Sequence, residues 1–148
     1  MSYTEDEYDE FARRMEKKFP KLFGHGQYGG FAVGAGWWPI LEELCERINS
    51  HVEWQQNQRE KYNKGSGCLD VTVNQVKEKF GGLRFYYSGG DDTVDGMVRM
   101  AESWAAHSCE ECGAPGKSRG GGWIRTLCDT HEAERQARYK KANDEIDM

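Results

Sequence analysis

No long run of apolar residues occurs in this 148-residue sequence. No stretch is long enough to span a bilayer, and no apolar segment follows Met1 as one would in a secretory leader. We therefore expect a cytoplasmic protein that does not contact membranes. Cysteine is scarce as well, with five residues in the chain. Of these, Cys45 and Cys68 are expected to be reduced thiols in the core rather than a disulfide.

Positive charge is also in short supply, because 20 Lys and Arg residues stand against 25 Asp and Glu, for a formal net charge of -5. This balance argues against a protein that binds nucleic acid over its whole surface. The charge is unevenly distributed, however. Acidic residues crowd segment 5–10, whereas segment 113–141 contains seven basic and three acidic residues. At this length we expect one domain, or one domain with a metal-binding appendage.

The most specific motif of the chain lies near its C-terminus. Cys109 and Cys112 form a Cys-x2-Cys pair, and after a gap of 15 residues Cys128 and His131 form a Cys-x2-His pair. Two short chelating pairs separated by a hairpin-length segment are typical of a tetrahedral zinc site. Gly113 directly follows the first pair and suits a tight turn around the sulfurs. The alternative is a set of unrelated buried thiols with an incidental histidine.

The residues around this motif predict a knuckle, a hairpin and a helix. Segments 114–119 and 123–127 are typical of two strands, and the glycines at 120–122 of the turn between them. Segment 132–143 has high helix propensity. This order predicts a treble-clef-like zinc module, whereas a zinc ribbon would lack the helix. Four protein ligands favour one structural Zn²⁺, and a catalytic ion with an exchangeable water is the alternative.

The N-terminal half of the chain predicts two helices and a loop. Residues 4–7 form a capping box for a first helix, which Pro20 ends. The glycine-rich segment 23–36 matches no phosphate-binding motif and predicts an irregular loop over the core. A second helix begins at Pro39 and carries an apolar stripe, and the polar segment 55–67 predicts its frayed end and a loop.

The middle of the chain predicts a small antiparallel sheet. Apolar and polar residues alternate from Leu69, and a turn at 80–82 leads to a return strand. Asp92 is expected to cap a further helix that runs directly into the zinc knuckle. The predicted fold class is therefore α+β, with a core over 1–106 and a zinc module over 107–148 packed on it.

Two sequence blocks prompt a comparison with a known family. The first is Val76–Tyr86 (VKEKFGGLRFY). The second is Cys109–Gly116 (CEECGAPG), followed by Gly122-Trp123 and by Thr126–His131 (TLCDTH). With Gly36-Trp37 upstream, these residues resemble a family of small proteins encoded by tailed bacteriophages and prophages, over most of the chain from about Gly36. The resemblance implies expression inside a bacterial host cell and an accessory role, such as counter-defence or host takeover. It implies no particular enzymatic activity.

A nuclease is the first functional hypothesis, because His-Cys and HNH nucleases are built on treble clefs. Such enzymes need a histidine near the first strand of the hairpin and ligands for a catalytic metal ion. Segment 113–127 contains no His, Asp or Glu, and His107 and Asp129 lie outside it. His25 and His51 have no recognisable catalytic partner, and His51 is expected to be satisfied at a helix edge. We therefore do not expect an enzyme.

Nucleic-acid binding through the zinc module is the second hypothesis. Basic residues can contact phosphates and a tryptophan can stack on bases. The candidate contacts are Arg119, Trp123, Arg125, Arg135, Arg138, Lys140 and Lys141. The alternative is a solvated helix with the tryptophan buried beneath the hairpin, and the acidic net charge favours this alternative.

Binding of a host protein is the third hypothesis and the preferred one. Aromatic residues make up 12% of the chain, and such residues are enriched in protein interfaces. Tyr28, Phe31 and Trp54 are the predicted exposed aromatics. The acidic residues near the N-terminus can face a basic surface on a host enzyme.

Overall fold

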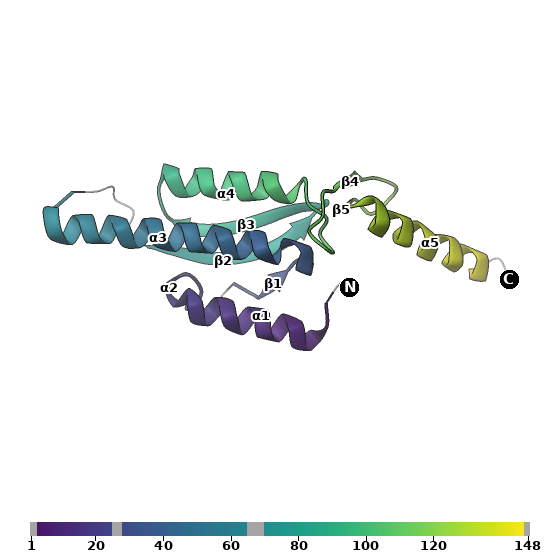
Figure 1. The fold of residues 1–148 in the computed structure, drawn as a ribbon, viewed down its shortest axis with the longest axis horizontal. Coiled ribbons are helices and arrows are strands. Elements are labelled where there is room, and N and C mark those ends of the chain that lie inside the picture. The colour runs from purple at the N-terminus through teal and green to yellow at the C-terminus, as the bar shows by residue number, and fades with distance from the viewer. Residues whose placement is uncertain (1–2, 25–27, 65–69, 147–148) are drawn as a thin grey trace.

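A computed structural model describes residues 3–24, 28–64 and 70–146 (Figure 1). His25, Cys68 and Leu69, about which the sequence made predictions, lie outside these ranges. The fold is α+β, as predicted. In chain order its elements are α1 (Glu5–Lys18), α2 (Pro20–Phe23), β1 (Phe31–Ala32), the 3-10 turn η1 (Ala35–Trp37), α3 (Trp38–Tyr62), β2 (Val71–Lys79), β3 (Gly82–Gly89), α4 (Asp92–Ala105), β4 (Lys117–Arg119), β5 (Arg125–Leu127) and α5 (Asp129–Ile146).

Helix α1 begins with the predicted capping box. The Thr4 hydroxyl accepts the Glu7 backbone N–H and the Glu7 carboxylate accepts that of Thr4, both at 3.1 Å. Phe11 and Met15 lie one turn apart on the buried face. The Phe11 ring stacks on that of Trp38, with centroids 4.5 Å apart. The capped helix is therefore held against the start of α3 by aromatic packing.

Helix α3 is longer than predicted. The fraying expected from residue 55 is wrong, because the helix continues to Tyr62 and ends at Asn63, which adopts a left-handed conformation with φ of 51°. The side chain of Gln55 is buried, so the core continues beneath the polar segment. Tertiary packing thus extends a helix whose end has little apolar sequence.

Three strands form the main sheet in the order β1-β2-β3. Strands β2 and β3 are the predicted antiparallel hairpin, with a bulge between Val73 and Gln75. Strand β1 pairs parallel to β2, with Phe31 opposite Val76, inside the segment predicted to be an irregular loop. The predicted exposure of Tyr28 and Phe31 is wrong, because they are only 8% and 1% exposed. Both rings belong to an aromatic cluster around β1.

Helix α4 is capped by Asp91 and not by Asp92. The Asp91 carboxylate accepts the Val94 backbone N–H at 3.0 Å. Its other oxygen lies 2.9 Å from Nε2 of His51 on α3. His51 is therefore satisfied at a helix edge, as expected, by a residue 40 positions away. The pair ties α3 to the start of α4.

The hydrophobic core belongs to the N-terminal two thirds of the chain. Among the described residues, the main cluster of buried side chains runs from Phe11 to Ala105. Beyond it, Cys109 and Leu127 are the buried hydrophobic side chains of the described C-terminal segment. This segment forms the predicted knuckle, the β4–β5 hairpin and α5, which extends away from the body (Figure 1). No described helix combines the length and apolar character needed to cross a membrane.

Candidate metal centre

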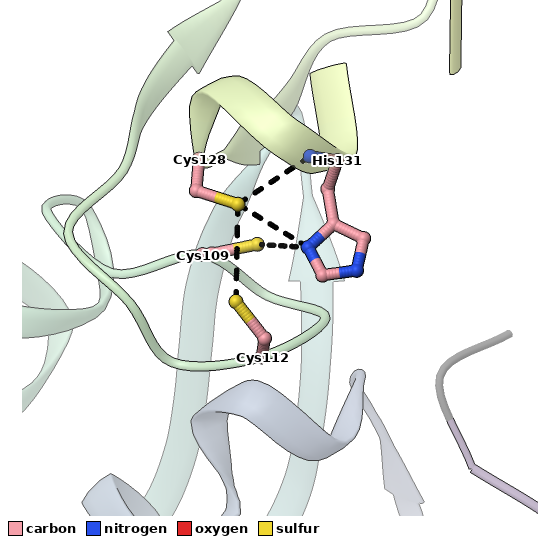
Figure 2. Close-up of side chains that lie close together, drawn as sticks. All are labelled: Cys109, Cys112, Cys128 and His131. Carbon is pink, nitrogen blue, oxygen red and sulfur yellow. Dashed lines mark hydrogen bonds between the residues drawn. The ribbon is translucent and has the colours of Figure 1, made fainter. Parts of the chain in front are cut away.

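Cys109, Cys112, Cys128 and His131 converge beside the first turn of α5 (Figure 2). The first two residues lie on the turn after α4, Cys128 follows β5, and His131 is on α5. Their donor atoms all lie within 4.8 Å of one another. The four residues predicted to be ligands are therefore close enough together to hold a metal ion.

The separations between the donor atoms fit a tetrahedral ion. Bonds of about 2.3 Å to sulfur and about 2.0 Å to nitrogen place two sulfurs about 3.8 Å apart, and a sulfur and a nitrogen about 3.5 Å apart. The Cys112 and Cys128 sulfurs are 3.8 Å apart. Nδ1 of His131 lies 3.5 Å from the Cys109 sulfur and 3.2 Å from that of Cys128. A disulfide would need about 2.05 Å, so the cysteines are free thiols.

The surroundings of the site shift the pKa values of the Cys128 and Cys112 thiols in opposite directions. The backbone N–H of His131 donates to the Cys128 sulfur at 3.4 Å and lowers the pKa of this thiol to about 7. Desolvation raises the pKa of the Cys112 thiol to about 11, and the neighbouring sulfurs add to the rise. Binding of a metal ion at neutral pH therefore displaces a proton from Cys112, because the thiolate is the ligand.

The knuckle between the first two ligands has the conformation that its sequence predicts. Gly113 has φ of 81°, a left-handed value that favours glycine. Its N–H donates to the Cys109 carbonyl at 2.8 Å, and the Cys109 N–H donates to the Ala114 carbonyl at 2.7 Å. These bonds fold the backbone back beneath the sulfurs. The two thiols consequently point to one side of the turn.

The turn η1 of the body packs directly on this knuckle. The Gly36 N–H donates to the Glu110 carbonyl at 2.7 Å. The indole N–H of the fully buried Trp37 donates to the Ser108 carbonyl at 2.9 Å. Buried backbone carbonyls need such partners. The body thus satisfies the polar groups of a turn that has few apolar contacts of its own.

The hairpin of the C-terminal segment is also fastened to the main sheet. The hydroxyl of Thr126 on β5 donates to the carbonyl of Gly81, in the β2–β3 turn, at 2.6 Å. The Glu110 carboxylate accepts the Gly34 backbone N–H at 2.8 Å. Burial raises the pKa of this carboxyl, against the opposing effects of the Gly34 N–H and the Arg125 charge. Buried polar contacts therefore join the metal centre to the body on two sides.

Glu111 lies behind the histidine of the site. One of its carboxylate oxygens is 3.7 Å from His131 Nε2, on the side of the ring away from the sulfurs, and the other accepts Nη1 of Arg125 at 3.2 Å. A carboxylate in this place favours one orientation of a ligand histidine by its charge. We expect Glu111→Gln to weaken metal binding about tenfold, measured by competition with a chromophoric chelator.

The matched control is Glu134→Gln. Glu134 lies 3.9 Å from the same nitrogen, but its side chain is more than half exposed. Solvent screening makes its interaction with the imidazole weak, so this variant should keep nearly the affinity of the native chain. Equal losses in both variants would show that charge near the site matters and orientation of His131 does not.

Three of the residues predicted to contact nucleic acid instead make hydrogen bonds within the protein. The first two are on the β4–β5 hairpin. Arg119 donates to the Leu127 carbonyl at 3.1 Å and to the Asp129 carboxylate at 2.7 Å. The adjacent guanidinium also lowers the pKa of the Asp129 carboxyl. Arg125 is held by Glu111. Both side chains brace the metal centre and are poorly placed to meet a phosphate backbone.

Arg135 is the third, and it is only 2% exposed. Its guanidinium donates to the carbonyls of Trp123 at 2.7 Å and Gly120 at 3.0 Å, and to the Glu132 carboxylate at 3.1 Å. A buried guanidinium requires such partners, because an unpaired charge away from water is costly. Arg135 therefore anchors the loop between β4 and β5 to helix α5.

The other four candidate contacts face solvent. Arg138, Lys140 and Lys141 are exposed on α5. The ring of Trp123 is 68% exposed, so its burial beneath the hairpin, the alternative from the sequence, is wrong. Trp54 on α3 is exposed as predicted.

Glu110, Glu111 and the buried role of Arg135 were not anticipated from the sequence. The two glutamates stand between the first two ligands, and this position was their only signal. Arg135 resembles any basic residue of a solvated helix, because its partners are backbone carbonyls that carry no sequence pattern.

No protein-family model, curated protein or solved structure matches this chain.

Proposed function

We propose that the chain is a zinc-stabilised accessory protein of phage origin that acts by binding a protein of its bacterial host. The resemblance to phage-encoded proteins supports the setting. The observation that carries the binding role is Trp123, a large aromatic side chain that the C-terminal segment displays to solvent. Exposed tryptophans are the residues most often found at the energetic centres of protein interfaces.

The loop that carries Trp123 is ordered in the unbound protein by hydrogen bonds within the chain. Arg135 donates to the Trp123 carbonyl and to the carbonyl of Gly120, at the other end of the loop. Arg135 is itself fixed by Glu132 on the same helix. Because the loop is already ordered, binding through the Trp123 ring loses little conformational entropy.

The surroundings of Trp123 suit a protein partner. A groove of about 670 Å³ runs between the body and the C-terminal segment, and Trp123, Arg138 and Tyr139 are among its lining residues. Trp, Tyr and Arg are the residue types enriched at interface hot spots. Glu78 and Glu110 also line the groove and give it mixed charge. Mixed charge beside aromatic rings favours a protein over a polyanion.

Zinc has a structural role in this proposal. With Cys109, Cys112, Cys128 and His131 as ligands, the ion has no open position and supplies no catalysis. The ion joins the knuckle to the first turn of α5, in the order typical of a treble clef. It thereby fixes the hairpin and α5, from which Trp123 and Tyr139 project.

The first test of this function compares two tryptophans. Tagged native protein, Trp123→Ala and the matched control Trp54→Ala, which alters an exposed ring on α3, are used to capture partners from bacterial lysate with and without nuclease. We expect one host protein that survives nuclease treatment, binds Trp54→Ala normally and binds Trp123→Ala at least about thirtyfold more weakly, as for a hot spot of 2 kcal/mol. Titration of the purified partner measures that ratio.

Two outcomes would contradict the proposal. The first is recovery of nucleic acid alone, which would favour the alternative function, a nucleic-acid-binding zinc module. The second is equal capture by both tryptophan variants, which would place any interface elsewhere on the molecule.

A further inference from the structure

One face of the β2–β3 hairpin is uncovered and basic. The buried side chains are Val71, Val73 and Val76 on β2, where the bulge interrupts the alternation, and Leu83 and Phe85 on β3. The intervening side chains are exposed or half-buried, so the helices cover one face only. Gln75, Lys77, Lys79, Arg84 and Tyr86 lie on the other face, and Phe80 stands at its end in the turn, beside Lys79. We call these six residues the open sheet face. All of these residues except Gln75 belong to the VKEKFGGLRFY block, and none of them lines the groove beside Trp123.

No acidic side chain of β2 or β3 neutralises this face. Glu78 points to the opposite side, where its carboxylate accepts the Gly81 backbone N–H at 2.7 Å. Lys77 and Arg84 stand directly opposite each other in the sheet register. Like charges in such a pair destabilise a sheet. A polyanion that lies across the strands would remove this repulsion.

The same face carries two exposed aromatic rings, each with a lysine beside it. The Lys77 ammonium lies 5.7 Å from the centre of the Tyr86 ring, and that of Lys79 lies 5.8 Å from the centre of the Phe80 ring. Within the described part of the chain, neither lysine has an ion-pair partner. Rings that alternate with cations along a surface are what single-stranded nucleic acids bind, through base stacking and phosphate contacts.

Packing does not explain why Phe80 occupies the tip of the hairpin. It is 72% exposed and has φ of 53°, in the left-handed region that bulky residues seldom adopt. Asparagine followed by glycine is the sequence that such a two-residue turn favours. A strained and exposed aromatic side chain that the fold does not need is consistent with a ligand contact.

We propose that the open sheet face binds single-stranded nucleic acid, with Tyr86 and Phe80 stacking on bases and with Lys77, Lys79 and Arg84 contacting phosphates. The two rings are separated along the hairpin by about four residues, or roughly 13 Å, which accommodates a run of several nucleotides. This inference does not rest on the proposed protein partner. The two activities use different residues and can fail independently.

The test is fluorescence anisotropy of a labelled oligothymidylate of about 12 nucleotides with the full metal-loaded chain. We expect binding that weakens as salt is added. In the double variant Lys77→Ala/Arg84→Ala, affinity should fall at least about tenfold and the salt slope should flatten by about 1.4, because each lost phosphate contact accounts for about 0.7. The double variant Lys140→Ala/Lys141→Ala removes the same charge from exposed positions of α5 and should bind normally.

Variants of the aromatic residues separate stacking from charge. Tyr86→Ala should lower affinity about tenfold, whereas Tyr86→Phe, which keeps the ring, should retain it. Phe80→Asn should raise the melting temperature, because asparagine tolerates the left-handed conformation, and should also weaken binding. A residue with a purely structural role would not produce these opposite changes.

Three results would overturn the proposal. The first is the absence of binding at about 100 μM protein in low salt, which is weaker than non-specific nucleic-acid binding normally is. The second is equal loss of affinity in the α5 and sheet variants. The third is competition by polyglutamate as effective as that by the oligonucleotide, together with no effect of Tyr86→Ala, which would indicate an acidic protein as the occupant.

Discussion

Replacing Cys128 with serine is expected to release the metal ion and to lower the free energy of unfolding by more than about 4 kcal/mol. The reason lies in the composition of the C-terminal segment. Its buried hydrophobic side chains are those of Cys109 and Leu127, within the described chain. A segment with so little apolar burial needs further stabilisation, and cross-linking by a metal ion would supply it. Cys109→Ser should behave in the same way.

The measurement combines metal analysis with thermal unfolding. The native chain should contain about one equivalent of zinc, and the Cys128→Ser variant almost none. The matched control is Cys45→Ala, which removes a thiol that is buried in α3 away from the metal centre. It should keep the metal and lose only about 1 kcal/mol of stability. Unchanged melting and metal content in Cys128→Ser would contradict the assignment of the site.

Substitution of Gly36 by alanine is expected to cause the second large loss of stability. A Cβ atom at this position would lie 2.2 Å from the carbonyl oxygen of Cys109 and 2.7 Å from the backbone nitrogen of Cys112. Both contacts are with the backbone of the metal knuckle, which cannot move away without breaking its hydrogen bonds to η1. We expect a loss of about 3 kcal/mol, at the upper end of the range for overpacked positions, measured by denaturant unfolding.

The control for this substitution is another glycine-to-alanine change. Gly96 lies within α4, and a Cβ atom there would meet nothing within 4 Å. Gly96→Ala should therefore stabilise the protein by about 1 kcal/mol through helix propensity. If Gly36→Ala destabilises the protein and Gly96→Ala stabilises it, the loss at Gly36 is caused by its close approach to the knuckle and not by the added methyl group as such. A Gly36→Ala variant as stable as the native chain would mean that the knuckle does not pack on η1.

The part of the site that the sequence predicts well is the part built by local geometry. Two residues separate the ligands of each pair, so one turn of chain brings Cys109 to Cys112, and Cys128 to His131. The glycines at 120–122 predict the reversal that joins the pairs. Likewise, the alternation along β2 and the turn after it predict the main hairpin, because adjacent strands need no distant information.

What the sequence did not predict depends on partners far along the chain. Strand β1 has two residues, and Phe31 is buried because it pairs beside Val76, 45 positions later. Tyr28 is buried because it packs on Phe31 in the same cluster. Arg135 is buried because carbonyls of a distant loop receive its hydrogen bonds. Neither the spacing of apolar residues nor the local propensity of the sequence predicts such contacts. From the sequence alone, these side chains therefore resemble ordinary surface residues.

X-ray absorption spectroscopy of the purified protein reports directly on the metal site, where three thiolates and one imidazole should hold one ion. At the zinc edge we expect three sulfur neighbours at about 2.3 Å and one nitrogen at about 2.0 Å, with no coordinated water. Absence of a metal signal, or a shell of oxygen ligands in higher coordination, would contradict this assignment of the ligands.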